Sequence, residues 1–267
     1  EPRLASGYSD VVVEPYASPS VHFLLPNTQN PLLRRRAFRR AIAHGINRAL
    51  VLESFQGKKD SEPGELISGP FPRGVAYDSS LEPLPYDPRM MIALATGAQE
   101  RIGGVGVSTT KPVTLVLAHP PTSVARRACA IIKQHLELDG KGIGVRLHEL
   151  NPQEKTPPWD LLYVEWFLMD PLTDAHRLLS DKALQWGDSR WIAPALRDLI
   201  RAENPQQARQ QLRAIHSAVH HDQTVIPLWQ LREHYARRKT LEGLGADLGT
   251  LYQNVEQWRH GPKIPKF

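Results

Sequence analysis

The chain of 267 residues is long enough for one large domain or two smaller ones with a well-buried core. Its 41% hydrophobic and 23% charged residues are typical of a globular protein and exclude a disordered one. The net charge of +5 is small for this size and identifies no acidic partner, and no apolar run approaches the roughly 20 residues that a membrane-spanning helix needs.

The chain has one cysteine, Cys129, so an internal disulfide and a cysteine-built zinc site are both ruled out. Cys129 shares a helix face with Ala125, Ile132 and Leu136, which favours a buried, inert thiol over a nucleophile. The chain begins with Glu1, and no signal sequence precedes the first elements. We therefore expect a piece of a longer protein.

The first third of the chain predicts two strands, one helix and a long loop. Short apolar runs between turn residues predict strands near 10–13 and 20–25. A helix is expected from about Leu33 to Phe55, and one of its faces is apolar: Phe38, Ala41, Ile42, Gly45, Ile46 and Ala49. The stretch 56–86 contains glycines and prolines without a sustained period, which predicts an ordered surface loop.

The remainder alternates between strands and helices. Asp87 as N-cap and Pro88 at the first helical position open a helix that Gly97 should close. A strand at 112–118, a helix at about 121–138 and a strand at 143–148 predict a crossover between parallel strands. Further elements are expected at 159–168 (strand), 172–180, 191–203 and 205–221 (helices), and as short strands in "TVIPLWQL", "HYARRKTLEGL" and "NVEQWR". The fold class is therefore α/β.

Five arginines occupy seven positions in "RRRAFRR", from Arg34 to Arg40. Nucleic-acid binding requires several basic side chains that reach phosphates together, usually with a second basic or aromatic element nearby. Here Arg36, Arg39 and Arg40 form one polar helix face, and no second element supports them. We favour a solvated or salt-bridged helix face and expect no nucleic-acid partner.

The sequence predicts no catalytic residue, metal site or cofactor. His216 and His220 have the i, i+4 spacing that zinc can use, with His221 beside them, but Ser217 stands where a metalloprotease has its glutamate, and no third ligand is suggested. The glycines of "GGVGVST" follow a helix and lack phosphate-loop spacing, and no nucleophile elbow occurs. Nothing here argues for an enzyme.

The best candidate site is "YVEWFLMDPLTD", where Tyr163, Trp166 and Phe167 end a strand next to a turn at Asp170 and Pro171. Ligands of α/β proteins gather beyond the carboxyl ends of strands. The alternative is that these aromatic residues belong to the core, since strand residues alternate between faces.

Several segments, in order, resemble the family 5 extracellular solute-binding proteins, which are the oligopeptide-, dipeptide- and nickel-binding receptors of ABC importers. The chain has Asn27 after a strand, followed by "FRRAIAHGINR", where the family has V-R-Q-A-[IL]-x-x-A-I-D-R. The later segments that match in order are "YDPRMMIALATGA", "GIGVRLHEL", "WDLLYVEW", "DP" at 170–171, "TVIPLWQ" and "LEGLG".

The resemblance covers the second half of the family's usual length and implies an incomplete fold. It implies a periplasmic-binding-protein-like lobe of the type II class, with a mixed sheet and flanking helices, plus strands that belong to a missing second lobe. Residues 25–230 would form the carboxy-terminal lobe. Residues 1–24 would be strands of the hinge and first lobe, and 231–267 would return to that lobe.

The resemblance also implies a ligand site. Peptide-binding members have a W-x-x-D motif whose aspartate pairs with the ligand's amino terminus, whereas Met169 stands at that position here, which implies a more apolar pocket. Trp229 matches a position where such members place an aromatic residue toward the cleft. The expected ligand-binding residues are Tyr163, Glu165, Trp166, Phe167, Met169 and Trp229.

The function that the resemblance implies is solute capture for an ABC importer. A peptide or other small solute would be bound by hinge closure and delivered to a permease at the membrane, in the periplasm or at the cell surface. The alternative is the solute-sensing domain of a transcription regulator with an upstream DNA-binding helix-turn-helix. The upstream sequence would separate the two hypotheses.

Overall fold

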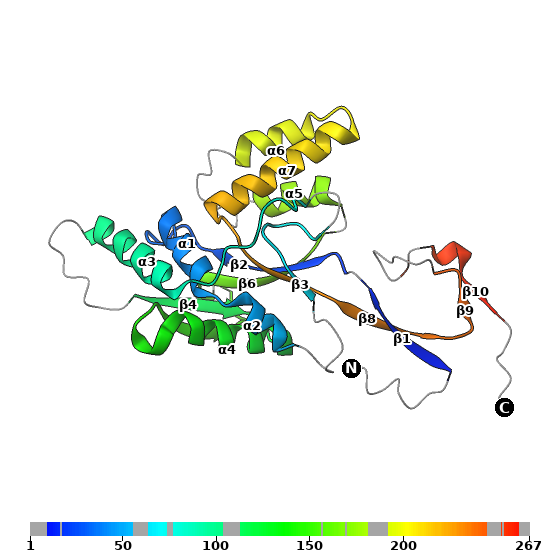
Figure 1. The fold of residues 1–267 in the computed structure, drawn as a ribbon, viewed down its shortest axis with the longest axis horizontal. Coiled ribbons are helices and arrows are strands. Elements are labelled where there is room, and N and C mark those ends of the chain that lie inside the picture. Colours follow the sequence, from blue (N-terminus) through cyan, green and yellow to red (C-terminus); the bar gives the residue numbers. More distant parts are fainter. Residues whose placement is uncertain are drawn as a thin grey trace.

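The computed structural model describes residues 10–16, 18–55, 64–73, 77–103, 113–155, 157–168, 170–180, 192–244, 252 and 254–261. A six-stranded sheet with the order β3-β7-β2-β6-β4-β5 forms its body (Figure 1). The strands are β2 (Ser20–Pro26), β3 (Gly64–Leu66), β4 (Thr114–His119), β5 (Gly144–Glu149), β6 (Leu161–Phe167) and β7 (Ile226–Leu231). They include the expected strands at 20–25, 112–118, 143–148 and 159–168, within a residue or two at each end where the residues are described.

The sheet is mixed, as the resemblance implied. β4 runs parallel to β5 and β6, and α4 (Ser123–Glu137) connects β4 to β5, which confirms the expected parallel crossover. β2 is antiparallel to both β6 and β7, so β4, β5, β6 and β7 all end at one edge of the sheet. We call this the carboxyl edge.

Helices cover both faces of the sheet, and each face has its own core. The first core joins the sheet to α1 (Arg36–Gly45), α2 (Arg48–Glu53), α3 (Pro88–Gly103) and α4. The second core joins the other face to α5 (Pro171–Ser180), α6 (Ile192–Ile200) and α7 (Pro205–Asp222), which are stacked above the sheet in Figure 1. Because neighbouring strand residues point to opposite faces, Leu24 lies in the first core and Phe23 in the second.

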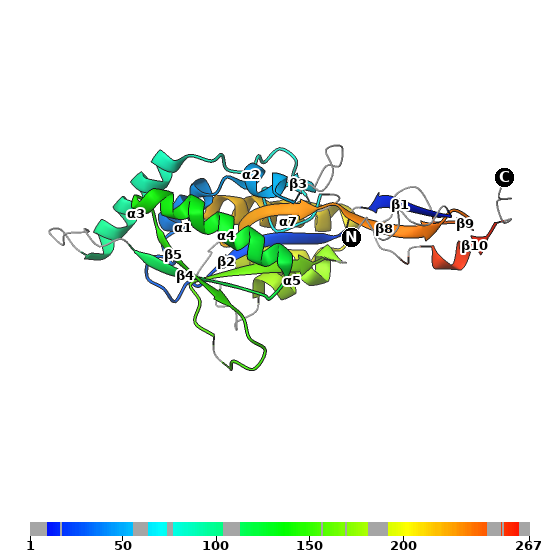
Figure 2. The ribbon, with the colours of Figure 1, turned by 90° about the horizontal axis from the view of Figure 1, so that it is seen from below.

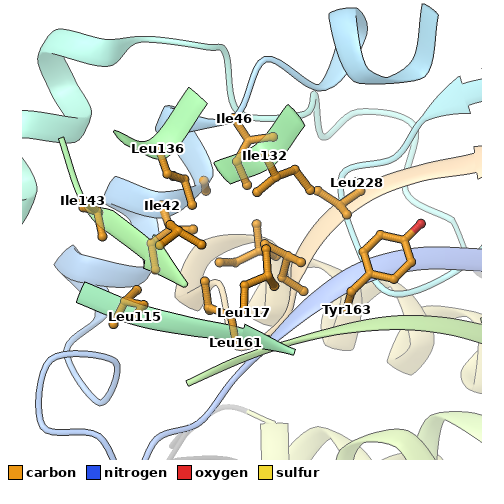
Figure 3. Close-up of a cluster of buried hydrophobic side chains, with 14 of the residues drawn as sticks. Ile42, Ile46, Leu115, Leu117, Ile132, Leu136, Ile143, Leu161, Tyr163 and Leu228 are labelled. Atoms are coloured by element: carbon orange, nitrogen blue, oxygen red, sulfur yellow. The ribbon is translucent and has the colours of Figure 1, made fainter. Parts of the chain in front are cut away.

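The first core is a cluster of aliphatic side chains from α1, α4 and the sheet. Figure 3 shows Ile42 of α1 and Leu136 of α4 converging on Leu115, Leu117 and other sheet residues. Tyr163 lies at the border of this cluster with its hydroxyl directed away from the aliphatic side chains. The aliphatic core therefore ends where β6 approaches the carboxyl edge.

The helix expected from Leu33 to Phe55 is wrong as a single element. α1 ends at Gly45, Ile46 is extended with φ −105° and ψ 115°, and the Asn47 side chain caps α2. At the break, the His44 carbonyl accepts the backbone N–H of Asp87 at 2.9 Å instead of that of Arg48, and Gly45 packs closely on α3, since a Cβ there would lie 2.4 Å from the sulfur of Met91. Ala49, expected on the buried face, is exposed as a result.

The second helix begins where the sequence predicts and ends later. Oδ1 of Asp87 accepts hydrogen bonds from the backbone N–H of Arg89 and Met90 at 3.0 and 2.9 Å, which confirms the N-cap. α3 does not stop at Gly97 but continues to Gly103. Among the residues that the structure describes, no atom lies within 4 Å of a Cβ built at Gly97, so the position would also accept a residue with a side chain.

The stretch 56–86, expected to be one loop, contains the short strand β3, which pairs with β7. Residues 56–63, 74–76 and 104–112, the last of which include most of the glycine-rich stretch, lie outside the described residues. The expected helices near 172–180, 191–203 and 205–221 correspond to α5, α6 and α7 over their described residues.

A two-stranded ribbon extends away from the sheet. β1 (Val11–Tyr16) pairs antiparallel with β8 (Glu233–Arg238), which follows directly after β7, and the ribbon projects beyond the carboxyl edge in Figures 1 and 2. Past it, β9 (Leu241–Glu242) pairs with β10 (Arg259–His260). The strand expected at "NVEQWR" is largely wrong, because Val255–Gln257 forms a 3-10 turn before β10.

Candidate functional site

The expected binding residues of β6 divide between the two faces of the sheet. Glu165 pairs with His22 and Phe167 pairs with Ser20 across the β2–β6 ladder, and residues directly opposite in a ladder share a face. Together with Tyr163, they point to the side of the first core. Trp166 pairs with Val21 on the other face, so the structure does not bring it together with the others.

Trp166 packs against the second core. The guanidinium carbon of Arg177 on α5 lies 5.9 Å from its ring centroid, within the range of a cation–π contact. The tryptophan that sequence reasoning placed at the centre of the site therefore fastens α5 to the sheet.

Trp229 and Tyr163 form a buried aromatic floor with His22. Trp229 is fully buried, and its ring centroid lies 6.2 Å from that of His22 and 6.5 Å from that of Tyr163. The Tyr163 oxygen is hydrogen-bonded to Nδ1 of His22 at 2.9 Å. Burial raises the pKa of Tyr163 well above its usual value and lowers the pKa of His22 to about 4, so both side chains are neutral at neutral pH.

Two residues of β6 reach solvent above this floor. The side chain of Glu165 is 49% exposed, with Oε1 4.0 Å from Nε2 of His22, and Phe167 is 51% exposed. Partial burial, and then the negative charge of Glu233, raise the pKa of Glu165. Glu233 stands at the start of the ribbon, where its Oε2 accepts a hydrogen bond from the Tyr16 hydroxyl at 2.6 Å. We call Ser20, His22, Glu165, Phe167 and Glu233 the edge cluster.

Sequence reasoning missed Ser20, His22 and Glu233. The signal for the first two is their polarity within β2, in which every residue is buried. A buried polar side chain in a strand requires a partner, and the alternation of side chains places Ser20 and His22 on one face. Nothing in the sequence indicates that Glu233, beyond the end of β7, approaches this place.

Met169, the residue at the expected aspartate position, lies outside the described residues. The nearest aspartate along the chain, Asp170, caps α5. Its Oδ1 accepts from the backbone N–H of Leu172 at 3.1 Å and its Oδ2 from the Thr173 hydroxyl at 2.8 Å. Both oxygens of the Asp170 carboxylate are thus hydrogen-bonded within the first turn of α5.

The histidines of α7 point to different partners. A ring nitrogen of the fully buried His216 is 3.0 Å from the Ser68 hydroxyl, whereas Nε2 of His220 is 2.9 Å from the Glu82 carbonyl. Across the described ranges, no three His, Cys, Asp or Glu residues are grouped to hold a metal ion. Cys129 is buried, and burial raises its pKa, so it is a poor nucleophile.

The arginine cluster is bonded to the fold through backbone carbonyls, with Arg34 and Arg36 exposed as expected and Arg39 buried. Arg39 is 6% exposed and donates to the carbonyl oxygens of Leu33, Arg34, Asp222 and Gln223. Arg34, Arg35 and Arg36 each donate to a backbone carbonyl as well, those of Thr28, Arg101 and His221. The expectation of a solvated face is wrong for Arg39, because the helix C-terminus of α7 offers it unpaired carbonyls.

Residues 3–182 match the family model described as bacterial extracellular solute-binding proteins, family 5, middle region. The chain belongs to this family. The resemblance drawn from the sequence motifs is thereby confirmed, and family 5 proteins are binding proteins rather than enzymes.

Solved structures of family 5 proteins share the fold. The oligopeptide-binding protein AppA from Bacillus subtilis, in complex with a nonapeptide, matches with a TM-score of 0.75 and 15% identity over 97% of this chain and 54% of AppA. CtaP from Listeria monocytogenes, an ABC transporter substrate-binding protein, matches with a TM-score of 0.78 and 13% identity over 98% of this chain and 54% of CtaP. NikZ from Campylobacter jejuni, in complex with Ni(L-His), matches with a TM-score of 0.72 and 15% identity over 96% of this chain and 55% of NikZ. The chain thus spans about half the length of these structures, and its mixed sheet with flanking helices corresponds to a lobe of a periplasmic binding protein.

One curated protein outside the family also matches. A 3-oxoacyl-[acyl-carrier-protein] reductase from Buchnera aphidicola is 32% identical over 96 residues, which is 35% of this chain and 37% of the reductase. This partial match carries no assignment, because the family 5 match covers most of the chain. In the part of the chain that is described, no helix has the length and apolar character to cross a membrane.

Proposed function

We propose that the protein is the substrate-binding component of an ABC importer, which captures a peptide or other small solute at the carboxyl edge and delivers it to a permease. Membership of family 5 supports the binding role. The observation that carries the proposal is the edge cluster itself, in which half-exposed Glu165 and Phe167 lie above a neutral aromatic floor beside the ribbon. On this proposal the protein works in the periplasm or at the cell surface.

The ribbon is the proposed hinge. Residues 25–230 would form one lobe, whereas 1–24 and 231–267 would belong to the hinge and the other lobe. The ribbon is held by a bidentate pair in which Arg237 donates to both carboxylate oxygens of Glu14 at 2.8 and 2.7 Å, and Tyr235 donates to Glu14 at 2.7 Å. A ribbon fastened in this way can rotate as a unit at its junction with the sheet.

The expected binding residues take different roles in this proposal. Glu165 and Phe167 contact the solute, Tyr163 and Trp229 support the floor beneath it, and Trp166 holds α5 from the opposite face. By the resemblance, the residue at the aspartate position of peptide-binding members is Met169, which would make the pocket more apolar.

A ligand screen on the full-length protein tests the proposal. Solute released from the purified protein is identified by mass spectrometry and added back in a thermal-shift assay. A solute at 100 times its dissociation constant adds about 2.7 kcal/mol of stability. Phe167→Ala should reduce the shift, whereas Ile200→Ala, which removes an apolar side chain that is 67% exposed on α6, should leave it unchanged. Failure of every peptide, amine, sugar and metal complex to stabilise the protein would contradict the proposal.

A further inference from the structure

Four arginines around the start of α1 keep contact with solvent, although Arg39 beside them is bonded into the fold. Arg34 and Arg36 are exposed, and Arg35 and Arg40 are half-buried. Arg36 and Arg40 are four residues apart on α1, so their side chains are neighbours on one helix face. These four are the part of the arginine-rich motif that neither the core nor the proposed solute site uses.

Two further helices meet α1 at this place. Arg35 donates from Nη2 to the backbone carbonyl of Arg101 on α3 at 3.1 Å, and Arg101 is exposed. Arg36 donates from Nε to the backbone carbonyl of His221 on α7 at 3.0 Å. The positive charge therefore extends beyond α1, which the sequence pattern alone does not show. We call Arg34, Arg35, Arg36, Arg40 and Arg101 the basic corner.

The basic corner has no acidic counterpart in the part of the chain that the structure describes. Elsewhere on the surface, Arg126 forms an ion pair with Glu149. No carboxylate of the described residues forms such a pair with an arginine of the basic corner. Asp222, at the nearby end of α7, has its Oδ1 3.1 Å from Nδ1 of His221. The described fold therefore leaves most of this positive charge unbalanced.

The guanidinium groups of Arg34 and Arg36 are held in place with most of their donors open. Each uses Nε for one backbone carbonyl, which is that of Thr28 at 3.3 Å for Arg34. A guanidinium has five N–H donors, so the four on Nη1 and Nη2 remain, in the fork that matches two oxygens of a phosphate. Burial, and then the positive charge of Arg36, lower the pKa of Arg40, and an anion next to both side chains relieves that repulsion.

The basic corner lies at the edge of the sheet opposite to the ribbon. β2 ends at Pro26, which pairs with Leu161 at the start of β6, and α7 ends shortly before β7 begins, so α1 starts at the edge where β6 and β7 start. The ribbon projects from the carboxyl edge, on the far side of the sheet in Figure 1. On the proposed function the rest of the protein continues from the ribbon and leaves the basic corner uncovered.

We propose that the basic corner docks the protein onto an anionic phospholipid membrane, with the arginine forks on the lipid phosphates. The inference rests on the proposed function in one respect, the location in the periplasm or at the cell surface, where phospholipid rather than nucleic acid is the phosphate-bearing surface. Docking goes beyond solute capture, because it holds the lobe at the membrane by the edge that does not bind the solute.

Vesicle flotation of the full-length protein tests the docking. We expect binding to vesicles of equal parts phosphatidylglycerol and phosphatidylcholine and none to phosphatidylcholine alone, with weaker binding as the salt concentration rises. Arg34→Gln combined with Arg36→Gln should weaken binding about 25-fold, since each basic side chain near an anionic surface contributes about fivefold.

Two further double variants serve as controls. Arg201→Gln combined with Arg209→Gln removes the same charge from exposed positions outside the basic corner and should weaken binding less than about twofold. Arg34→Lys combined with Arg36→Lys keeps the charge and should bind more tightly than the glutamine pair at the same positions. Melting temperatures close to that of the wild type show that the variants fold.

Several results would overturn the inference. These are failure to float with phosphatidylglycerol, equal weakening by the two glutamine pairs, binding that does not change with salt, and binding to a DNA duplex without binding to vesicles. Solute capture without vesicle binding overturns this inference alone, whereas vesicle binding without any stabilising solute contradicts the proposed function alone.

Discussion

The guanidinium of Arg39 joins α1 to the turn before it and to the end of α7 through backbone carbonyls. It bonds the turn before α1 at Leu33 and Arg34, and the end of α7 at Asp222 and Gln223, at distances of 2.7 to 3.1 Å. Burial lowers its pKa to about 10, so it remains charged at neutral pH. Its position in the family motif is thus explained by the fold rather than by a ligand.

Replacement of Arg39 should be strongly destabilising. Arg39→Ala leaves several buried carbonyls without donors, so we expect a loss of about 3–5 kcal/mol in the free energy of unfolding. The neighbouring Arg40→Ala, which truncates a less buried arginine of the same helix, serves as the control, with an expected loss of about 1 kcal/mol or less. If urea denaturation shows that Arg39→Ala and Arg40→Ala lower the free energy of unfolding equally, the role assigned to Arg39 is contradicted.

At the scale of elements, α7 is joined to the segment around Ser68 and Asp78 through the imidazole of His216. Nδ1 of His216 accepts the backbone N–H of Asp78 at 3.1 Å, and Nε2 lies 3.0 Å from the Ser68 hydroxyl. A Cβ at Gly69 would lie 2.3 Å from the imidazole ring, so the segment packs directly on it. Burial lowers the pKa of His216 to about 4, which keeps the ring neutral.

Stability should fall as the pH is lowered from about 6.5 to about 4. His22 and His216 have folded-state pKa values near 4 against an ordinary value of 6.5, so in this window the unfolded chain binds protons that the folded chain does not. We expect a loss on the order of a few kcal/mol in the free energy of unfolding, measured by urea denaturation at several pH values. His216→Gln should make the free energy of unfolding depend less steeply on pH in this window. Constant or rising stability toward pH 4 would contradict the assignment.

The order of the elements was predictable from the sequence, whereas contacts between distant elements were not. The Asp87 cap and the strands around α4 follow from local patterns, but the break at Ile46 coincides with a long-range hydrogen bond from the backbone N–H of Asp87 to the His44 carbonyl, which no local pattern records. The alternation of β6 indicates that Glu165 and Trp166 point to opposite faces. Which face reaches solvent at the carboxyl edge depends on where helices cover the sheet, and that is a property of the assembled fold.

At the scale of the whole molecule, the sheet and the ribbon meet at the edge cluster. Glu165 belongs to the sheet and Glu233 to the ribbon, so a solute bound between them would contact both the lobe and the proposed hinge. Differential binding of the solute to the closed arrangement would then shift the population toward closure. The chain spans about half the length of AppA, and closure is therefore a property to be measured on the full-length protein.

Small-angle X-ray scattering of the full-length protein, with and without its co-purified solute, tests solute capture by closure most directly. We expect the radius of gyration to decrease on addition of the solute and the decrease to saturate at the concentration at which binding saturates. Glu165→Gln should move both midpoints to higher concentration together, whereas Glu100→Gln, which neutralises an exposed glutamate of α3, should move neither. A solute that saturates the protein while the radius of gyration stays constant would contradict capture by hinge closure.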